Sequence, residues 1–182
     1  MLIRTYGGPD VFEAGEVETP HPGSNEVRVR CRASSVNPVD ASIRAGMLKS
    51  FVWLKLPAVL GVDVADEVVE TGRHATRFKR GERVFAFTGI RRGGGYGEYA
   101  VVPEAALAII PSKLSWAEAG SVPGVGATAY EALTERAPLK SGIRLCRDKR
   151  VLASCQRVST TWTKAMIEAL RKVIKRMHTR WR

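Results

Sequence analysis

The sequence predicts a mainly β domain that carries a few short helices and is followed by a basic helical tail. Three observations predict this fold class. Short apolar runs before Gly142 are separated by glycine turns, which is typical of a small barrel or sandwich. All 17 glycines and all 9 prolines lie at or before Gly142. Residues 143–182 instead place apolar side chains at spacings of three and four, as an amphipathic helix does.

The first clear strand is expected over residues 26–36, because apolar and basic side chains alternate there. One face is apolar and the other is basic: Val27, Val29, Cys31 and Ala33 against Arg28, Arg30 and Arg32. This alternation predicts a strand with one face towards the core and one towards water.

The other elements follow from β-type runs, turn residues and helix start signals. Further strands are expected at 62–70, 83–87, 96–102 and 107–110. Helices are expected at 38–45, 115–119 and 128–136. Glycine-rich turns, such as the one at 92–95, separate the strands. The first domain is therefore expected to span residues 1–142.

Positive charge is concentrated at the end of the chain, whose net charge is +11. Residues 143–182 hold 12 basic and 2 acidic side chains, whereas residues 1–142 hold 17 and 16. An amphipathic helix is expected at about 161–181. Three interpretations of this tail stay open. It covers an apolar surface of the first domain, it binds nucleic acid or an anionic membrane surface, or it has no fixed structure.

Other features limit the class of protein. No run of 18 or more apolar residues occurs, so we expect neither a membrane span nor a signal peptide, and a cytoplasmic location. The three cysteines, Cys31, Cys146 and Cys155, have no C-x-x-C spacing, which favours unpaired thiols over a disulfide framework or a zinc ribbon.

Local spacing identifies no catalytic or metal site. The histidines, His21, His74 and His178, lie far apart and are expected at the surface. The glycines at 93–97 precede a strand rather than a helix, which favours a hairpin turn. The glycines at 124–126 open a helix, but no strand precedes them, so they are a weak dinucleotide-binding signal.

An ordered set of motifs nevertheless resembles a known family. The set is Tyr6-Gly7-Gly8-Pro9, Ser35-Val36-Asn37-Pro38-Val39-Asp40, Ile43-Arg44-Ala45-Gly46, Gly61-Val62-Asp63-Val64-Ala65, Gly81-Glu82-Arg83-Val84, Gly94-Gly95-Tyr96-Gly97-Glu98-Tyr99 and the segment 123–133. In this order the motifs resemble the N-terminal half of quinone oxidoreductases, the zeta-crystallin branch of the medium-chain dehydrogenase/reductase superfamily. The resemblance covers about residues 1–142.

The resemblance implies a GroES-like barrel whose cleft faces a Rossmann domain. In that cleft a reduced nicotinamide, usually NADPH, passes hydride to a quinone or another activated double bond, such as an enone. Zinc-dependent alcohol dehydrogenases of the superfamily carry a ligand cysteine and a Gly-His-Glu segment. Asn37 and Gly61-Val62-Asp63 stand at those places, so no zinc is expected.

Four site residues follow from the resemblance. Asn37 is expected beside the nicotinamide, and Thr128, at the start of a helix, is expected near the same end of the cofactor. Asp40 and Arg44 are expected to line or buttress the substrate cleft. Structural roles are the alternative: a turn or cap for Asn37, an i,i+4 ion pair for Asp40 and Arg44, and a cap for Thr128.

Two departures from the family alter the expected function. Ser42 and Leu48 stand where many relatives have tyrosines, and Leu48 cannot donate the proton that enoyl reductases of the superfamily take from a tyrosine near that place. After Gly142 no Gly-rich turn follows, so the Rossmann domain is expected to be absent and the chain to be a truncated or frame-disrupted enzyme, inactive alone. The alternative is a non-catalytic barrel domain whose basic tail binds an acidic partner.

Overall fold

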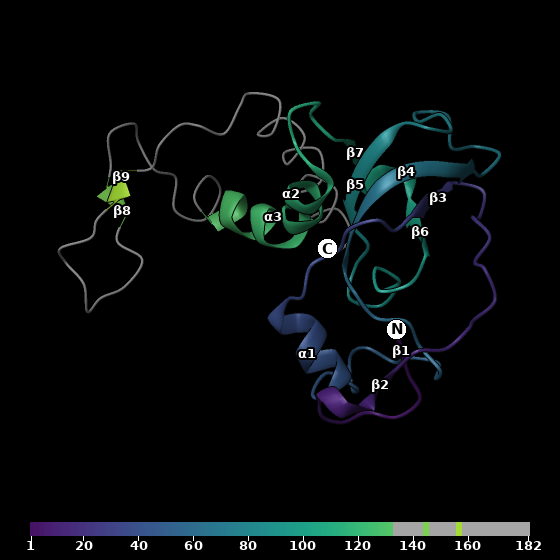
Figure 1. Cartoon of the computed structure of the whole chain (residues 1–182), viewed down its shortest axis with the longest axis vertical. Helices are drawn as coiled ribbons and strands as arrows, with labels where there is room; N and C mark the ends of the chain where they lie inside the picture. The colour runs from purple at the N-terminus through teal and green to yellow at the C-terminus, as the bar shows by residue number, and fades with distance from the viewer. Residues whose placement is uncertain (133–143, 146–155, 158–182) are drawn as a thin grey trace.

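A computed structural model of the protein describes residues 1–132 in full and the backbone of residues 144–145 and 156–157. The first part is built on a five-stranded antiparallel sheet with the strand order β6-β3-β4-β5-β7 (Figure 1). Its strands are β3 (Glu26–Arg30), β4 (Asp63–Thr71), β5 (Arg83–Phe87), β6 (Tyr99–Pro103) and β7 (Leu107–Ile109). All strand pairs of the described residues are antiparallel, and the mainly β fold class is confirmed.

Strand β3 lies between β6 and β4 and has the two faces that its alternation predicts. Val27 and Val29 are fully buried in the core. On the opposite face Arg28 forms an ion pair with Glu70, with 2.8 Å between Nη2 and Oε2. The register shifts between Arg28 and Val29, which is the mark of a β-bulge.

The other described elements are short strands and helices. A two-stranded sheet joins β1 (Leu2–Ile3) to β2 (Phe12–Glu13), and β8 (Arg144–Leu145) pairs with β9 (Gln156–Arg157). The helices are α1 (Pro38–Arg44), α2 (Trp116–Ser121) and α3 (Pro123–Glu131), with the short 3-10 helices η1 (Pro9–Val11) and η2 (Glu104–Ala106). In Figure 1, α2 and α3 lie together beside the sheet, whereas α1 lies next to β1 and β2.

Three apolar clusters hold these elements together. The first is formed by side chains from all five strands of the large sheet and includes Val27, Val68 and Leu107. The second, around Phe85, packs α2 and α3 against the sheet. The third, which includes Ile3, Ile43, Val52 and Leu60, joins α1 to β1 and to the segment 48–60.

Local chemistry explains where the helices begin. The Ser115 hydroxyl accepts a hydrogen bond from the N–H of Glu118 at 3.3 Å, while the Glu118 carboxylate accepts one from the N–H of Ser115 at 2.8 Å. This reciprocal pair is a capping box, and it starts α2. Helix α3 begins at Pro123, whose fixed φ suits the first helical position.

Three element boundaries within the described residues differ from the predicted ones by three residues or more, and others differ by one or two. Helix α3 begins at Pro123 rather than at residue 128, and residues 133–136 of the expected helix lie outside the described residues. Strand β3 ends at Arg30, and β6 begins at Tyr99 rather than at residue 96. The tail helix expected at about 161–181 also lies outside the described residues. No helix in the described part of the chain is long and apolar enough to cross a membrane.

Candidate functional site

A buried carboxylate joins three segments that are distant in sequence. Asp63, the first residue of β4, is fully buried. It accepts hydrogen bonds from the Ser35 hydroxyl, from Asn37 Nδ2 at 2.9 Å and from the backbone N–H of Gly124 at 2.8 Å. We call these residues, Asp63, Ser35, Asn37 and Gly124, the Asp63 cluster. It connects β4 with the start of α1 and the first turn of α3.

Asn37 has a fixed side-chain orientation within this cluster. It is the residue before α1, with φ −108° and ψ 155°, and its side chain is 7% exposed. Its Nδ2 donates to Asp63 and, at 3.0 Å, to the Ser35 hydroxyl. Since an amide nitrogen carries two protons, both donors are used, and the remaining hydrogen-bonding capacity of this side chain is that of an acceptor.

Asp40 fixes the start of α1 from the other side. Its Oδ2 accepts from the N–H of Asn37 at 2.8 Å, and its Oδ1 accepts from the N–H of Val62 at 3.1 Å. The side chain is 2% exposed. Arg44 points elsewhere: its Nε donates to the carbonyl of Gly7 at 3.2 Å. Asp40 and Arg44 therefore bond to different segments, and Asp40 buttresses the loop and helix start rather than lining a surface.

Burial sets the electrostatics of the site. Burial raises the pKa of Asp63, although its bonds from Ser35, Asn37 and Gly124 act in the opposite direction, because they favour the ionised form. Burial also raises the pKa of Tyr96, and the nearby Asp40 carboxylate raises it further. Because these carboxylate oxygens already accept bonds from within the chain, the cluster holds groups in place rather than offering a free base.

The structure places Thr128 differently from its prediction. Helix α3 begins five residues earlier, so Thr128 lies in its second turn rather than at its start. The side chain is exposed, and its hydroxyl donates to the carbonyl of Gly124 at 2.8 Å. The N-terminal amide of α3 that bonds at this site is that of Gly124, whose acceptor is Asp63.

Glycine allows a close approach where α3 meets the cluster. A Cβ added at Gly124 would lie 3.1 and 3.2 Å from the two Asp63 carboxylate oxygens and 3.4 Å from Asn37 Oδ1. Gly61 is constrained more strongly, since its φ is +93° and an added Cβ would lie 2.6 Å from the Tyr96 ring. A side chain at either position would therefore crowd its neighbours, and at Gly61 it would also strain the backbone.

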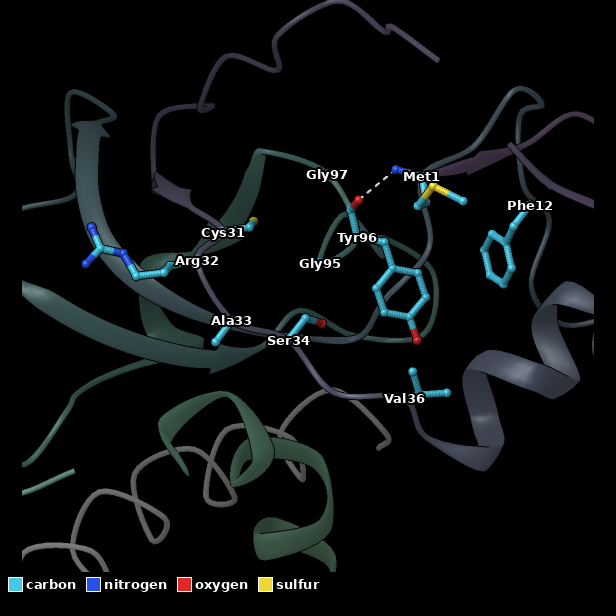
Figure 2. A pocket seen from close by; sticks show the side chains of 10 residues that line it. All are labelled: Met1, Phe12, Cys31, Arg32, Ala33, Ser34, Val36, Gly95, Tyr96 and Gly97. Atoms are coloured by element: carbon cyan, nitrogen blue, oxygen red, sulfur yellow. Dashed lines mark hydrogen bonds between the residues drawn. The ribbon is translucent and has the colours of Figure 1, made fainter. Parts of the chain in front are cut away.

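A pocket of about 410 Å³ lies beside the cluster. Figure 2 shows the Tyr96 side chain crossing this pocket, with its hydroxyl towards Val36 and its ring near Phe12. The Tyr96 hydroxyl donates to the carbonyl of Ser35 at 3.3 Å. None of the predicted site residues lines the pocket, although Val36 directly precedes Asn37.

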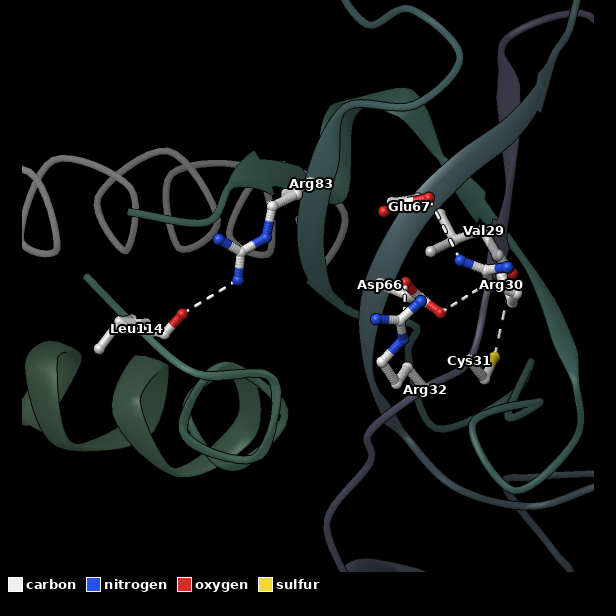
Figure 3. Close-up of polar contacts among 8 residues, drawn as sticks. All are labelled: Val29, Arg30, Cys31, Arg32, Asp66, Glu67, Arg83 and Leu114. Atoms are coloured by element: carbon white, nitrogen blue, oxygen red, sulfur yellow. Dashed lines mark hydrogen bonds and ion pairs between the residues drawn. The ribbon is translucent and has the colours of Figure 1, made fainter. Parts of the chain in front are cut away.

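A second polar group surrounds Asp66 of β4, which is fully buried (Figure 3). Asp66 forms ion pairs with Arg30 at 2.9 Å and Arg32 at 3.4 Å, measured from the Nε atoms. The Arg32 and Arg83 guanidinium carbons lie 4.7 and 4.1 Å from the centre of the Trp116 ring. These contacts attach α2 to the sheet, which is a structural role.

The remaining candidates among the described residues do not form a reactive site. His21 and His74 are exposed, as predicted, while His178 lies outside the described residues. Cys31 is an unpaired thiol, and burial raises its pKa to about 12, with a smaller contribution from Asp66. Among the described residues, no group of three or more His, Cys, Asp and Glu side chains is placed to hold a metal ion.

Sequence reasoning identified Asn37 of the Asp63 cluster and the neighbouring Asp40, but it did not identify Asp63, Ser35 or Gly124. Their contacts span 26 and 61 residues, so no local spacing encodes them. One signal was available. Asp63 stands between Val62 and Val64 at the apolar start of its strand, where a carboxylate needs buried hydrogen-bond donors.

Known proteins match the N-terminal part of the chain, which holds the Asp63 cluster. Residues 23–112 match the family model of the alcohol dehydrogenase GroES-like domain. The chain is 42% identical to the chloroplast envelope quinone oxidoreductase homolog of Arabidopsis thaliana over 141 residues, covering 77% of this chain and 43% of that protein.

Solved structures give the same result. A quinone oxidoreductase from Pseudomonas syringae pv. tomato matches with a TM-score of 0.70 and 34% identity, over 76% of this chain and 41% of that one. The Escherichia coli quinone oxidoreductase complexed with NADPH matches with a TM-score of 0.69 and 28% identity, over the same shares. The chain thus spans about two fifths of the length of these relatives.

Proposed function

We propose that this chain, which belongs to the alcohol dehydrogenase GroES-like domain family and resembles the quinone oxidoreductases, forms one wall of a hydride-transfer cleft. The reaction class is the reduction of a quinone or another activated double bond. NADPH, which is bound in the Escherichia coli relative, would supply the hydride, and a second domain would hold most of it. The arrangement of Asn37 carries this proposal.

Asn37 fits a role beside the nicotinamide as an oriented acceptor. With both Nδ2 protons donated to Asp63 and Ser35, the side chain cannot rotate without losing two buried hydrogen bonds. A fixed amide oxygen could accept a hydrogen bond from the cofactor and hold it at the correct angle. In this proposal Asp63 is a positioning residue, since it acts only through Asn37 and Gly124.

The donor chemistry of the cluster supports a reaction without zinc. Asn37 stands where zinc-dependent relatives have a ligand cysteine, and its amide nitrogen, which is not a metal donor, faces Asp63. Asp63, which stands where those relatives have a glutamate, already accepts three hydrogen bonds. These residues suit hydrogen bonding to an organic cofactor better than metal coordination.

The other three predicted residues take smaller parts in the proposal. Asp40 buttresses the cleft through the N–H groups of Asn37 and Val62. Arg44 is half-buried and lies over the Phe12 ring, 5.8 Å from its centre, at the edge of the same region. Thr128 is exposed on α3 and available to a cofactor only through its hydroxyl oxygen, since its proton is donated to Gly124.

The test joins residues 1–132 to the remaining part of the Escherichia coli quinone oxidoreductase and measures quinone reduction by NADPH. We expect turnover, and we expect Asn37→Ala to lower kcat/KM by roughly a hundredfold, because a misplaced cofactor reacts slowly. Asn25→Ala removes an exposed asparagine and serves as the matched control. A folded hybrid that binds NADPH and reacts equally well with Asn37→Ala would refute the proposal.

The charge distribution supports a second candidate function, a barrel domain whose basic tail binds an acidic partner. Its support is the sequence of residues 143–182, with 12 basic and 2 acidic side chains. Fluorescence titration of the 182-residue chain with a nucleic acid tests this second candidate. Micromolar binding that weakens as salt is added favours it, whereas absence of binding at low salt removes its support.

A further inference from the structure

Three large apolar side chains are exposed on the segment that follows α1. Met47 and Phe51 are each 75% exposed, and Trp53 is 90% exposed. Isolated exposed apolar side chains are common, but an exposed phenylalanine and tryptophan two residues apart are not explained by packing. We call residues 47–55 the aromatic segment.

The fold holds these aromatic side chains outward. Val52, between Phe51 and Trp53, is 1% exposed and belongs to the apolar cluster around Ile43. Leu54, which follows Trp53, is partly buried against the same cluster. Because Val52 and Leu54 anchor the backbone from inside, Phe51 and Trp53 cannot both turn inward. Their exposure is therefore a property of the packed structure.

The charged residues along this stretch of the chain have a single sign. Between Asp40 and Asp63 the chain contains no acidic residue, and it contains Arg44, Lys49 and Lys55. Lys49 and Lys55 are both exposed, and they flank the two aromatic residues. The aromatic segment thus presents apolar rings between two ammonium groups.

We propose that the aromatic segment binds the surface of an anionic lipid bilayer, with Phe51 and Trp53 in the headgroup layer and Lys49 and Lys55 against lipid phosphates. A headgroup layer offers apolar surroundings below and negative charge above, which matches this alternation of rings and ammonium groups. The cores of protein interfaces are depleted in lysine, so a protein partner fits less well. The observations behind this inference are separate from those behind the oxidoreductase proposal.

The experiment measures sedimentation of the 182-residue chain with vesicles of phosphatidylcholine containing about 30% phosphatidylserine. We expect Trp53→Ser to weaken binding roughly tenfold, since it removes a large apolar group from the headgroup layer. Lys49→Gln should weaken it roughly fivefold, and binding should fall as salt is added. Val17→Ser removes another exposed apolar side chain and should leave binding unchanged.

The basic residues of 143–182 could also attract anionic vesicles, so a second readout locates the contact. Lipids brominated on their acyl chains quench tryptophan that enters the membrane, and we expect quenching that Trp53→Phe abolishes while binding is largely kept. Equal circular dichroism of all variants excludes unfolding. Undiminished quenching in Trp53→Phe, equal binding by Trp53→Ser, or no binding to the vesicles would each overturn the proposal, and the last result would point to a protein partner.

Discussion

Replacing Asp63 by asparagine tests whether the Asp63 cluster depends on a carboxylate. The two side chains have nearly the same shape, so no cavity forms and only charge and hydrogen-bond polarity change. In the wild type, Oδ1 accepts from Gly124 and Oδ2 accepts from Ser35 and Asn37. In either orientation, the new NH2 group faces at least one of these donors.

The magnitude follows from the bonds that are lost. One buried donor without a partner costs about 1–3 kcal/mol, and the bonds that remain lose the strength that an ionised acceptor gives. Removal of a fully buried carboxylate offsets part of this loss. We expect Asp63→Asn to lower the free energy of unfolding at pH 7 by about 1–3 kcal/mol, measured by urea denaturation. Asp10→Asn, at an exposed position, is the control.

The pH dependence of this difference has a defined sign. The pKa of Asp63 is raised by burial above its ordinary value of 3.8, so the folded chain holds the proton more tightly than the unfolded chain. The stability gained from this proton is full below pH 3.8 and is lost as the pH rises through the folded pKa. The difference in free energy of unfolding between the wild type and Asp63→Asn should therefore be larger in acid and smaller at pH 7. A variant as stable as the wild type at both pH values would refute the reasoning.

Other predictions concern the surrounding structure. Gly61→Ala should destabilise the chain by about 2–5 kcal/mol in urea denaturation, because a positive φ and contact with Tyr96 both oppose a Cβ; an unchanged midpoint would contradict this. Ser115→Ala should cost about 0.5–2 kcal/mol through loss of the α2 cap, whereas Ser121→Ala, at the other end of that helix, should cost less. Cys31, with a pKa of about 12, should resist iodoacetamide at pH 8 until the chain is unfolded, and mass spectrometry of its peptide would detect any early alkylation.

Local patterns predicted the strands well because the order of apolar and polar residues within a strand reflects which of its side chains are buried. The run Arg83–Phe87 forms β5 with the predicted bounds, and the alternation at 26–30 matches the half-buried and buried positions of β3. The predicted strand extends to residue 36, but β3 ends at Arg30. After Arg30 only isolated backbone contacts follow: the N–H of Cys31 donates to the carbonyl of Glu98, and Ala33 forms a single β-bridge with Ala65. Alternation persists there without a continuous ladder.

The site was predicted only in part because its contacts are not local. Asn37 and Asp40 lie three residues apart, and that spacing is visible in the sequence. The bond from Gly124 to Asp63 joins two segments that only the folded sheet brings together. The same contact explains why α3 starts earlier than predicted. Glycine is a poor helix former, so the helix was expected only after the glycines at 124 and 126. In the structure Asp63 accepts a hydrogen bond from the N–H of Gly124, which has no partner within the first turn of the helix.

The strand order β6-β3-β4-β5-β7 has a consequence for how the chain acquires its structure during synthesis. The inner strand β3 is synthesised early. Its neighbour β6 is synthesised much later, since Glu26 of β3 pairs with Pro103 of β6, and the edge strand β7 ends at Ile109. A ribosome must therefore release most of this domain before the ladder closes, and distant pairings of this kind slow folding. Until then the unpaired edge of β3 is open to other nascent chains, so we expect productive folding to depend on the rate of translation and on chaperones that shield this edge.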